Sequence, residues 1–298
     1  MADINLKGMG VALITPFKED ESVDYEALGK LVDYQVQNGT DYLVVLGTTA
    51  ETPTLTEEEK KNIINLVVTR VRGRIPIVLG VGGNCTRSVV EKLKTDNFEG
   101  IDAILSVVPY YNKPSQEGIY QHYKAIANAT HLPIVLYNVP GRTGVNMTAE
   151  TTLRIAREFD NVIAVKEASG NISQVAKIMQ LTYGKIDLYS GNDDQVVPIL
   201  SLGGSGVISV LSNVAPRETH DMVQKFLDGD VAGAREIQLR ALPLIDALFC
   251  EVNPIPVKAA LNLMGKEVGP LRLPLTEMEP QNQERLAKAM KDFGIKLA

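Results

Sequence analysis

The stretch Ile163-Ala164-Val165-Lys166-Glu167-Ala168 is a short apolar run interrupted by one lysine. A run of this length and composition predicts a buried β-strand. Successive side chains of a strand point to opposite faces, so Ala164 and Lys166 are expected to share one face while Ile163 and Val165 share the other. The amine of Lys166 is then expected to lie where water is scarce.

Seven further β-rich runs resemble this one. They cover residues 11–15, 42–47, 77–81, 103–108, 134–138, 186–189 and 206–210. Near-continuous apolar strands are typical of a parallel sheet whose outer face is covered. The segments between them show helical spacing of apolar residues, and the clearest are 24–36, 56–71 and 148–159. Thr56 and Glu59 fit a capping box at the start of the second.

Eight strand–helix units predict an α/β fold, the (β/α)₈ TIM barrel, which typically needs about 250 residues. The alternative, a doubly wound open sheet, usually has a glycine-rich turn after its first strand, where this chain has Thr15-Pro16-Phe17. Beyond Ser212 the pattern changes to successive helices over 218–227, 231–248, 256–264 and 281–293. We therefore expect a catalytic barrel over 1–224 and a C-terminal helical appendage over 225–298.

The composition excludes several classes of function. Of the 298 residues, 45% are hydrophobic and 22% are charged, a composition that is ordinary for a globular protein. The net charge of −6 is unfavourable for binding nucleic acid or an anionic membrane surface. No apolar run approaches the roughly 20 residues of a membrane span. Cys85 and Cys250 are far apart, and we expect both to be buried thiols in a reducing compartment, the cytoplasm.

The chemistry is expected at the carboxyl ends of the strands, where (β/α)₈ barrels carry their active sites. Burial lowers the pKa of a lysine, and a neutral amine can condense with a ketone to form a Schiff base, so Lys166 is a candidate nucleophile. The alternatives are that Lys166 reaches solvent or pairs with Glu167. Thr48 and Thr49 could bind a carboxylate or cap a helix. Tyr137 lies near the end of the strand predicted at 134–138, and Arg142 lies in the loop that follows it. The three histidines form no ligand cluster, so we expect no metal site.

Four motifs at the strand ends stand out, which are Gly47-Thr48-Thr49-Ala50-Glu51, Val108-Pro109-Tyr110-Tyr111-Asn112, Tyr137-Asn138-Val139-Pro140-Gly141-Arg142-Thr143-Gly144 and Lys166-Glu167-Ala168. A fifth, Asn253-Pro254-Ile255-Pro256-Val257-Lys258, lies in the expected C-terminal appendage. Together they resemble the 4-hydroxy-tetrahydrodipicolinate synthase (dihydrodipicolinate synthase) family, within the superfamily of class I pyruvate-dependent aldolases and N-acetylneuraminate lyase. The resemblance covers essentially the whole chain. One departure is Ala50, where the family usually has glycine.

The resemblance implies that Lys166 forms a Schiff base with pyruvate and that the derived enamine adds to L-aspartate 4-semialdehyde. This is the first committed step of the diaminopimelate and lysine pathway. It implies a hydroxyl relay of Tyr137, Thr48 and Tyr111. Further residues it assigns to substrate binding are Thr49, Arg142, Gly191 and Ile208. It implies no cofactor and a homotetramer built as a dimer of dimers, with Tyr111 reaching into the neighbouring subunit's site.

Two related activities stay open, those of N-acetylneuraminate lyase and of 2-keto-3-deoxy-acid aldolases, which share the barrel and the lysine. The Arg142-Thr143-Gly144 sequence favours the semialdehyde as the second substrate. Feedback-inhibited members of the family bind lysine near the second and third strand loops, at positions that correspond here to Glu57, Lys60 and Ser88. Because Ser88 carries no negative charge and Lys60 adds a positive one, we expect weak inhibition by lysine or none.

Overall fold

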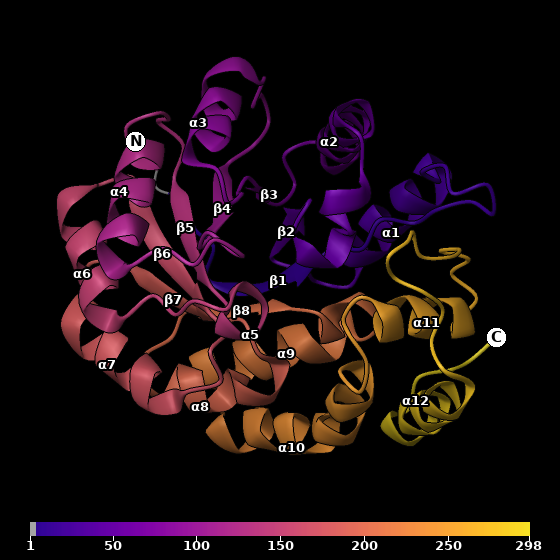
Figure 1. Ribbon diagram of the computed structural model, residues 1–298. Helices are drawn as coiled ribbons and strands as arrows, with labels where there is room; N and C mark the ends of the chain where they lie inside the picture. The colour runs from indigo at the N-terminus through magenta and orange to yellow at the C-terminus, as the bar shows by residue number, and fades with distance from the viewer. Residues whose placement is uncertain (1–3) are drawn as a thin grey trace. The chain divides into compact units, whose positions relative to one another are not determined.

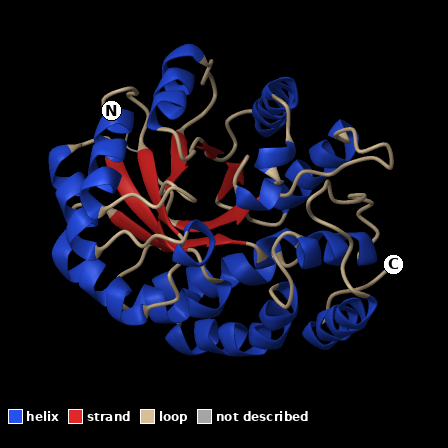
Figure 2. Ribbon diagram, in the orientation of Figure 1, coloured by secondary structure: helices blue, strands red, loops and turns tan. Residues whose placement is uncertain are grey.

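The computed structural model describes residues 4–298 and contains eight strands that alternate with helices (Figure 2). The strands are β1 (Gly8–Ala12), β2 (Tyr42–Val45), β3 (Ile77–Gly80), β4 (Ala103–Val107), β5 (Ile134–Asn138), β6 (Val162–Glu167), β7 (Asp187–Ser190) and β8 (Gly206–Ser209). Their order is β1 to β8 in a closed barrel, which confirms the predicted (β/α)₈ fold.

The helices follow the strands in the expected alternation (Figure 1). Those between strands are α1 (Tyr25–Gln37), α2 (Glu57–Val71), α3 (Thr86–Thr95), α4 (Gln116–Ala127), α5 (Pro140–Thr143), α6 (Ala149–Glu158), α7 (Ile172–Thr182) and α8 (Val196–Ser201). After β8 come α9 (Pro216–Leu227), α10 (Val231–Leu248), α11 (Ile255–Leu263) and α12 (Pro280–Phe293). The predicted helical C-terminal segment is therefore confirmed.

Contacts along the chain define two compact units. The first unit consists of Ile77–Ile208 with the N-terminal residues up to Lys7, and the second of Gly8–Pro76 with Ser209–Ala298. The predicted boundary at residue 224/225 concerns a different division, barrel against appendage, and stays a prediction.

The core of the first unit is the parallel sheet β3 to β7, with α3, α4, α6 and α7 packed in sequence outside it (Figure 1). Ile104, Val135 and Val165, from three adjacent strands, are completely buried. Burying such a side chain stabilises the folded state by about 1.5–3 kcal/mol. These strands therefore form a rigid support for the side chains at their carboxyl ends.

In the second unit, β1 pairs with β2, and α9 packs against β1. The helices α10 and α12 pack together, and Leu244 of α10 and Leu286 of α12 are both fully buried. The helix α2 begins with the expected capping box, since Thr56 accepts a hydrogen bond from the Glu59 amide and the Glu59 side chain accepts one from the Thr56 amide.

The first strand differs from the prediction, which placed it at residues 11–15. It spans Gly8–Ala12 and includes Gly10, which lies against the ring of Tyr42, where a β-carbon would come within 2.1 Å of the ring. Glycine is unusual inside a strand and often marks a place where another group approaches the backbone closely. The sequence pattern therefore did not recognise Gly8–Gly10 as part of the strand and placed its start too late.

The prediction that both cysteines are buried was wrong. Cys85 is exposed and Cys250 is half-buried, and both thiols are free. Cys85 is the N-cap residue of α3, at the junction of loop and helix, where hydrogen bonds from Ser88 lower the pKa of its thiol.

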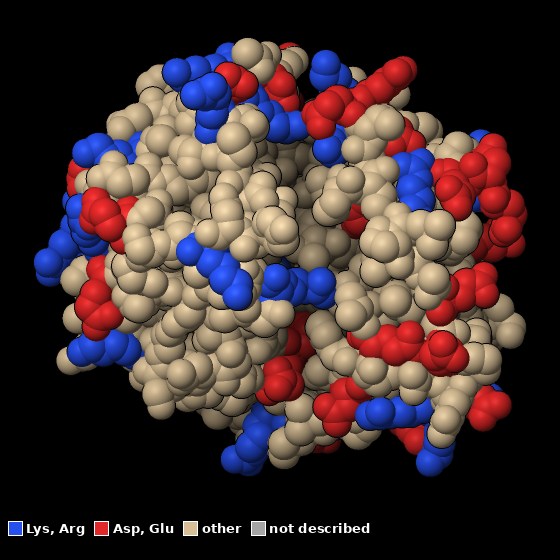
Figure 3. Space-filling model, in the orientation of Figure 1, with Lys and Arg blue, Asp and Glu red and all other residues tan. Residues whose placement is uncertain are grey.

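The surface carries charges of both signs, with Lys and Arg interspersed among Asp and Glu on the face that Figure 3 shows. Among the helices of residues 4–298, none is both long enough and apolar enough to cross a membrane.

Candidate active site

Lys166 lies near the carboxyl end of β6, and its neighbours in register are Tyr137 of β5 and Tyr189 of β7. Only 7% of its surface is exposed, as expected for a lysine in an apolar strand. Its Nζ lies 4.4 Å from the centroid of the Tyr137 ring. The structure therefore brings together the predicted nucleophile and one predicted member of the hydroxyl relay.

Burial lowers the pKa of Lys166 to about 8. The negative charge of Asp193 partly opposes this change by raising the pKa, and the positive charge of Arg142 lowers it further. A pKa of about 8 leaves about one amine in ten neutral at pH 7, whereas an unshifted lysine leaves about one in 10³–10⁴. Lys166 is thus prepared to act as a nucleophile near neutral pH.

The alternative in which Lys166 pairs with Glu167 does not fit the contacts of Glu167. This carboxylate accepts hydrogen bonds from Asn138 Nδ2 at 3.0 and 3.2 Å, from the Ser169 amide at 2.8 Å and from Gln174 Nε2 at 3.2 Å. Glu167 therefore joins β6 to β5 and to α7, on the opposite face of the strand from Lys166.

The loop after β7, also in the first unit, contains a buried acidic residue whose charge acts on Lys166. Asp193, only 2% exposed, follows β7, and sequence reasoning did not select it. Gly191 precedes it and donates its amide to the Glu167 carbonyl at 2.8 Å. A β-carbon on Gly191 would come within 2.5 Å of the Ala168 side chain, so glycine permits this close approach.

Arg142 and Ile208 also belong to the first unit. Arg142 lies in the short helix α5 and is exposed, and its positive charge contributes to the lowered pKa of Lys166. The helix is held by Thr143, whose hydroxyl donates to the Val145 carbonyl at 2.8 Å. Ile208 is a buried residue of β8.

Tyr111 is placed differently from the other candidates. Its side chain is 87% exposed and its backbone has a φ of 71°, in the left-handed region. Within residues 4–298, no hydrogen bond joins it to Lys166 or Tyr137. The structure of this single chain therefore does not assemble the predicted relay around Tyr111.

The second unit carries the candidates Thr48 and Thr49, in the short 3-10 helix η1 (Thr48–Ala50) after β2. Thr48 is exposed, whereas Thr49 is 3% exposed and its Oγ1 accepts a hydrogen bond from Asn253 Nδ2 at 2.9 Å. The role of Thr48 in a relay stays a prediction.

A buried ion pair next to η1 was missed by sequence reasoning. Lys258 Nζ lies 3.0 Å from Glu51 Oε1, and both side chains are almost completely buried. The same Nζ donates to the Pro270 carbonyl and lies 4.2 Å from the centroid of the Phe17 ring. The two residues are 207 positions apart, so no local pattern could have joined them.

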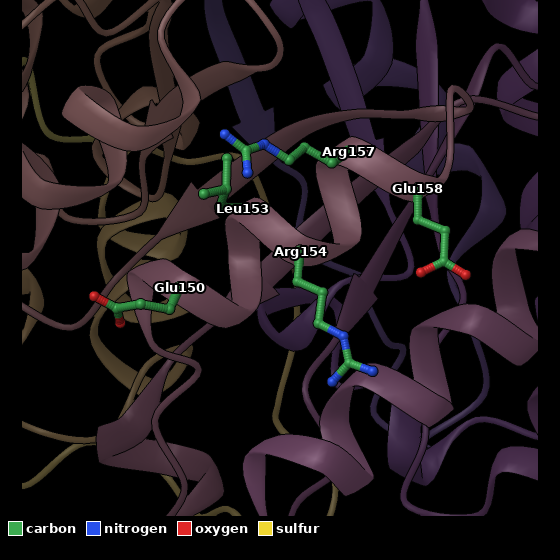
Figure 4. A pocket seen from close by; sticks show the side chains of 5 residues that line it. All are labelled: Glu150, Leu153, Arg154, Arg157 and Glu158. Carbon is green, nitrogen blue, oxygen red and sulfur yellow. The ribbon is translucent and has the colours of Figure 1, made fainter.

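A hollow on the outer surface of α6 contains none of the candidates. Figure 4 shows the residues that line it, which are Glu150, Leu153, Arg154, Arg157 and Glu158. Arg154 pairs with Glu117 of α4, and Glu158 accepts a hydrogen bond from Tyr120 at 2.5 Å. We interpret it as a surface hollow between partnered charges.

No group of three or more His, Cys, Asp and Glu side chains in residues 4–298 is arranged to hold a metal ion.

Comparison with known proteins identifies the family. A chain from Parabacteroides distasonis named 4-hydroxy-tetrahydrodipicolinate synthase is 72% identical over 99% of this chain and all of that protein. One of the same name from Phocaeicola vulgatus is 60% identical over 99% of this chain and 100% of its own length. A solved structure, the chloride-inhibited dihydrodipicolinate synthase from Acinetobacter baumannii complexed with pyruvate, is 42% identical with a TM-score of 0.95, over 98% of this chain and 100% of that one. The sequence profile of the Dihydrodipicolinate synthetase family matches residues 5–293, and the chain belongs to this family.

Proposed function

We propose that this protein is a 4-hydroxy-tetrahydrodipicolinate synthase, which condenses pyruvate with L-aspartate 4-semialdehyde. The observation that carries the proposal is the buried Lys166, with a pKa of about 8, at the carboxyl end of a strand of a (β/α)₈ barrel. The names of the relatives from Parabacteroides distasonis and Phocaeicola vulgatus support the activity, and the pyruvate complex of the Acinetobacter baumannii protein supports the first substrate.

In the proposed first step, the neutral amine of Lys166 attacks the ketone carbon of pyruvate. The C–N bond forms, the ketone oxygen takes up a proton, and loss of water from the resulting carbinolamine gives an imine. Tyr137, whose ring lies beside the lysine, is the proposed donor and acceptor of these protons. Thr48 and Tyr111 would connect it to solvent as the rest of the relay.

In the second step, loss of a proton from the pyruvate methyl group turns the imine into an enamine. Its nucleophilic carbon forms a C–C bond with the aldehyde carbon of the semialdehyde, and the aldehyde oxygen becomes a hydroxyl. The amino group of the same substrate then attacks the imine carbon, which closes the ring and releases Lys166 with its amine restored.

The carboxylates of the two substrates require separate recognition. We assign the pyruvate carboxylate to Thr49 and the semialdehyde carboxylate to Arg142, because a planar guanidinium suits bidentate binding of a carboxylate. Gly191 and Ile208 would line the pyruvate pocket.

We further propose a homotetramer, built as a dimer of dimers. The 87% exposure of Tyr111 supports contact with a second subunit, the smallest part of this assembly, because a large aromatic residue in a strained loop is better explained if a neighbouring subunit covers it. The two free cysteines fit a reducing compartment, and we place the reaction in the cytoplasm.

The test has two parts. The first follows turnover of pyruvate and L-aspartate 4-semialdehyde through the downstream reductase, and we expect activity that Lys166→Ala abolishes. The second traps the imine with borohydride and locates the adduct by peptide mapping. Lys258 is the matched control, since it is also a buried lysine with a pKa lowered to about 8.

An adduct on Lys258 instead of Lys166 would contradict the assignment of the nucleophile. An adduct on Lys166 without turnover would refute the synthase activity. That second result would direct the search to aldehydes used by N-acetylneuraminate lyase and 2-keto-3-deoxy-acid aldolases.

A further inference from the structure

The turn that carries Thr49 is held in an unfavourable backbone conformation. Glu51, directly after η1, has φ 53° and ψ 33°, the left-handed region that is unfavourable for residues other than glycine. Such a conformation is energetically unfavourable and persists only when neighbouring contacts fix it. Two of those contacts come from one segment, residues 253–258.

Two side chains of this segment hold the turn at two points. Asn253 Nδ2 donates to Thr49 Oγ1 at 2.9 Å, and Lys258 Nζ donates to Glu51 Oε1 at 3.0 Å. The second carboxylate oxygen of Glu51 accepts a hydrogen bond from the backbone amide of Arg272 at 3.0 Å. Because the Glu51–Lys258 pair is buried, it gives this part of the chain a fixed position from which Asn253 acts.

The hydrogen bond from Asn253 decides which way the Thr49 hydroxyl can donate. A threonine hydroxyl has one hydrogen and two lone pairs. One lone pair of Thr49 receives the Asn253 amide hydrogen, so the hydroxyl hydrogen must point elsewhere. No residue of the part of the chain that the structure describes accepts it. Thr49 is therefore a donor ready for an acceptor that comes from outside the chain, and a carboxylate is such an acceptor.

We propose that Asn253 is a positioning residue for pyruvate binding, which orients the Thr49 hydroxyl as a hydrogen-bond donor to the substrate carboxylate. The proposal rests on the proposed function and adds to it the residue that determines how Thr49 recognises a 2-oxo acid. Asn253 acts through Thr49, so its effect belongs to the binding of pyruvate and not to the later carbon–carbon bond formation.

The decisive variant is Asn253→Asp, which keeps the shape of the side chain and replaces the donor with an acceptor. Its carboxylate would draw the Thr49 hydrogen toward itself and leave lone pairs facing the substrate. We expect the pyruvate concentration for half-maximal borohydride trapping to rise by about tenfold or more, the effect of about 1.4 kcal/mol. Asn253→Ala removes the orientation without reversing it and should have a smaller effect. At saturating pyruvate, kcat should change much less than the half-saturation concentration.

A double-mutant cycle separates orientation from general damage to the fold. In a Thr49→Val background there is no hydroxyl to orient, so adding Asn253→Ala should change pyruvate half-saturation by less than about twofold. The matched control is Asn262→Asp on α11. Asn262 accepts the Val268 amide at 2.8 Å and does not contact Thr49, so this variant should bind pyruvate like the wild type even if it is less stable.

Unchanged pyruvate trapping in Asn253→Asp would overturn the proposal. The proposal would also be overturned if the increases in pyruvate half-saturation caused by Asn253→Ala and by Thr49→Val multiplied fully in the double variant, because that is the behaviour of two residues that act independently. Trapping requires pyruvate alone, so a wild-type protein that traps pyruvate but does not consume the semialdehyde refutes the synthase activity and leaves this test valid. A wild-type protein that traps no pyruvate refutes both.

Discussion

At the scale of single residues, the charges around Lys166 determine the pH at which the protein works. Burial lowers its pKa to about 8, and Asp193 partly opposes that change. Only the neutral amine attacks a ketone, so the rate constant kcat/KM for pyruvate should rise with pH and level off above about pH 8.

Asp193→Asn tests the electrostatic part of this account. Asp193 raises the pKa of Lys166, so its removal should lower that pKa and move the rising limb of the kcat/KM profile to lower pH. Asp194→Asn, the same change at the neighbouring exposed position, should leave the limb in place. A profile of Asp193→Asn that moves to higher pH, or does not move, would contradict this account.

At the scale of elements, the helix α2 is joined to the C-terminal segment through Glu59. Its carboxylate accepts a hydrogen bond from the Thr56 amide at the start of the helix. It also accepts hydrogen bonds from both terminal nitrogens of Arg272, from Nη1 at 2.9 Å and from Nη2 at 2.5 Å. These contacts lower the pKa of Glu59 to about 2, from an ordinary value of 4.5, and the Arg272 hydrogen bond is the largest cause.

A carboxyl group whose pKa is lowered on folding stabilises the protein above its unfolded pKa, and the contribution disappears as pH falls toward the folded value. Glu59→Gln should therefore lower the free energy of unfolding by on the order of 2 kcal/mol at pH 7, a figure reduced for partial contact with water. The difference from the wild type, measured by urea denaturation, should shrink as pH falls below about 4.5. Glu58→Gln, one residue earlier and exposed, is the control, and a difference independent of pH would refute the mechanism.

The elements that could be predicted from the sequence are those whose signals are local. Strands such as β5 and helices such as α2 were predicted because their signals are local: an apolar run, or a capping box followed by an apolar stripe. Lys166 was selected for the same reason, as a charge inside an apolar run. The contact of Glu51 with Lys258 is not local, and it depends on how the chain returns to η1 after 207 residues. Asp193 was missed because an acidic residue after a strand is ordinary until its burial is known.

At the scale of the whole molecule, buried lysines and buried tyrosines determine how the free energy of unfolding changes at alkaline pH. Lys166 and Lys258 have pKa values lowered to about 8 by burial. Burial raises the pKa of Tyr34 to about 12 and that of Tyr123 and Tyr189 further still. The two sets act in opposite directions and over different ranges of pH.

Between about pH 8 and 10.5 the unfolded chain still holds protons on both amines that the folded protein has released, so stability should rise with pH by a few kcal/mol. Above about pH 10 the unfolded tyrosines lose protons that the folded ones keep, so stability should fall. Urea denaturation at a fixed subunit concentration should therefore show a maximum of stability near pH 10. Lys166→Met should remove part of the rise without affecting the fall, because it deletes one of the two amines and none of the tyrosines. A stability that decreases steadily from pH 8 would show that these amines are protonated in the folded protein and that Lys166 lacks the neutral form on which the proposed chemistry depends.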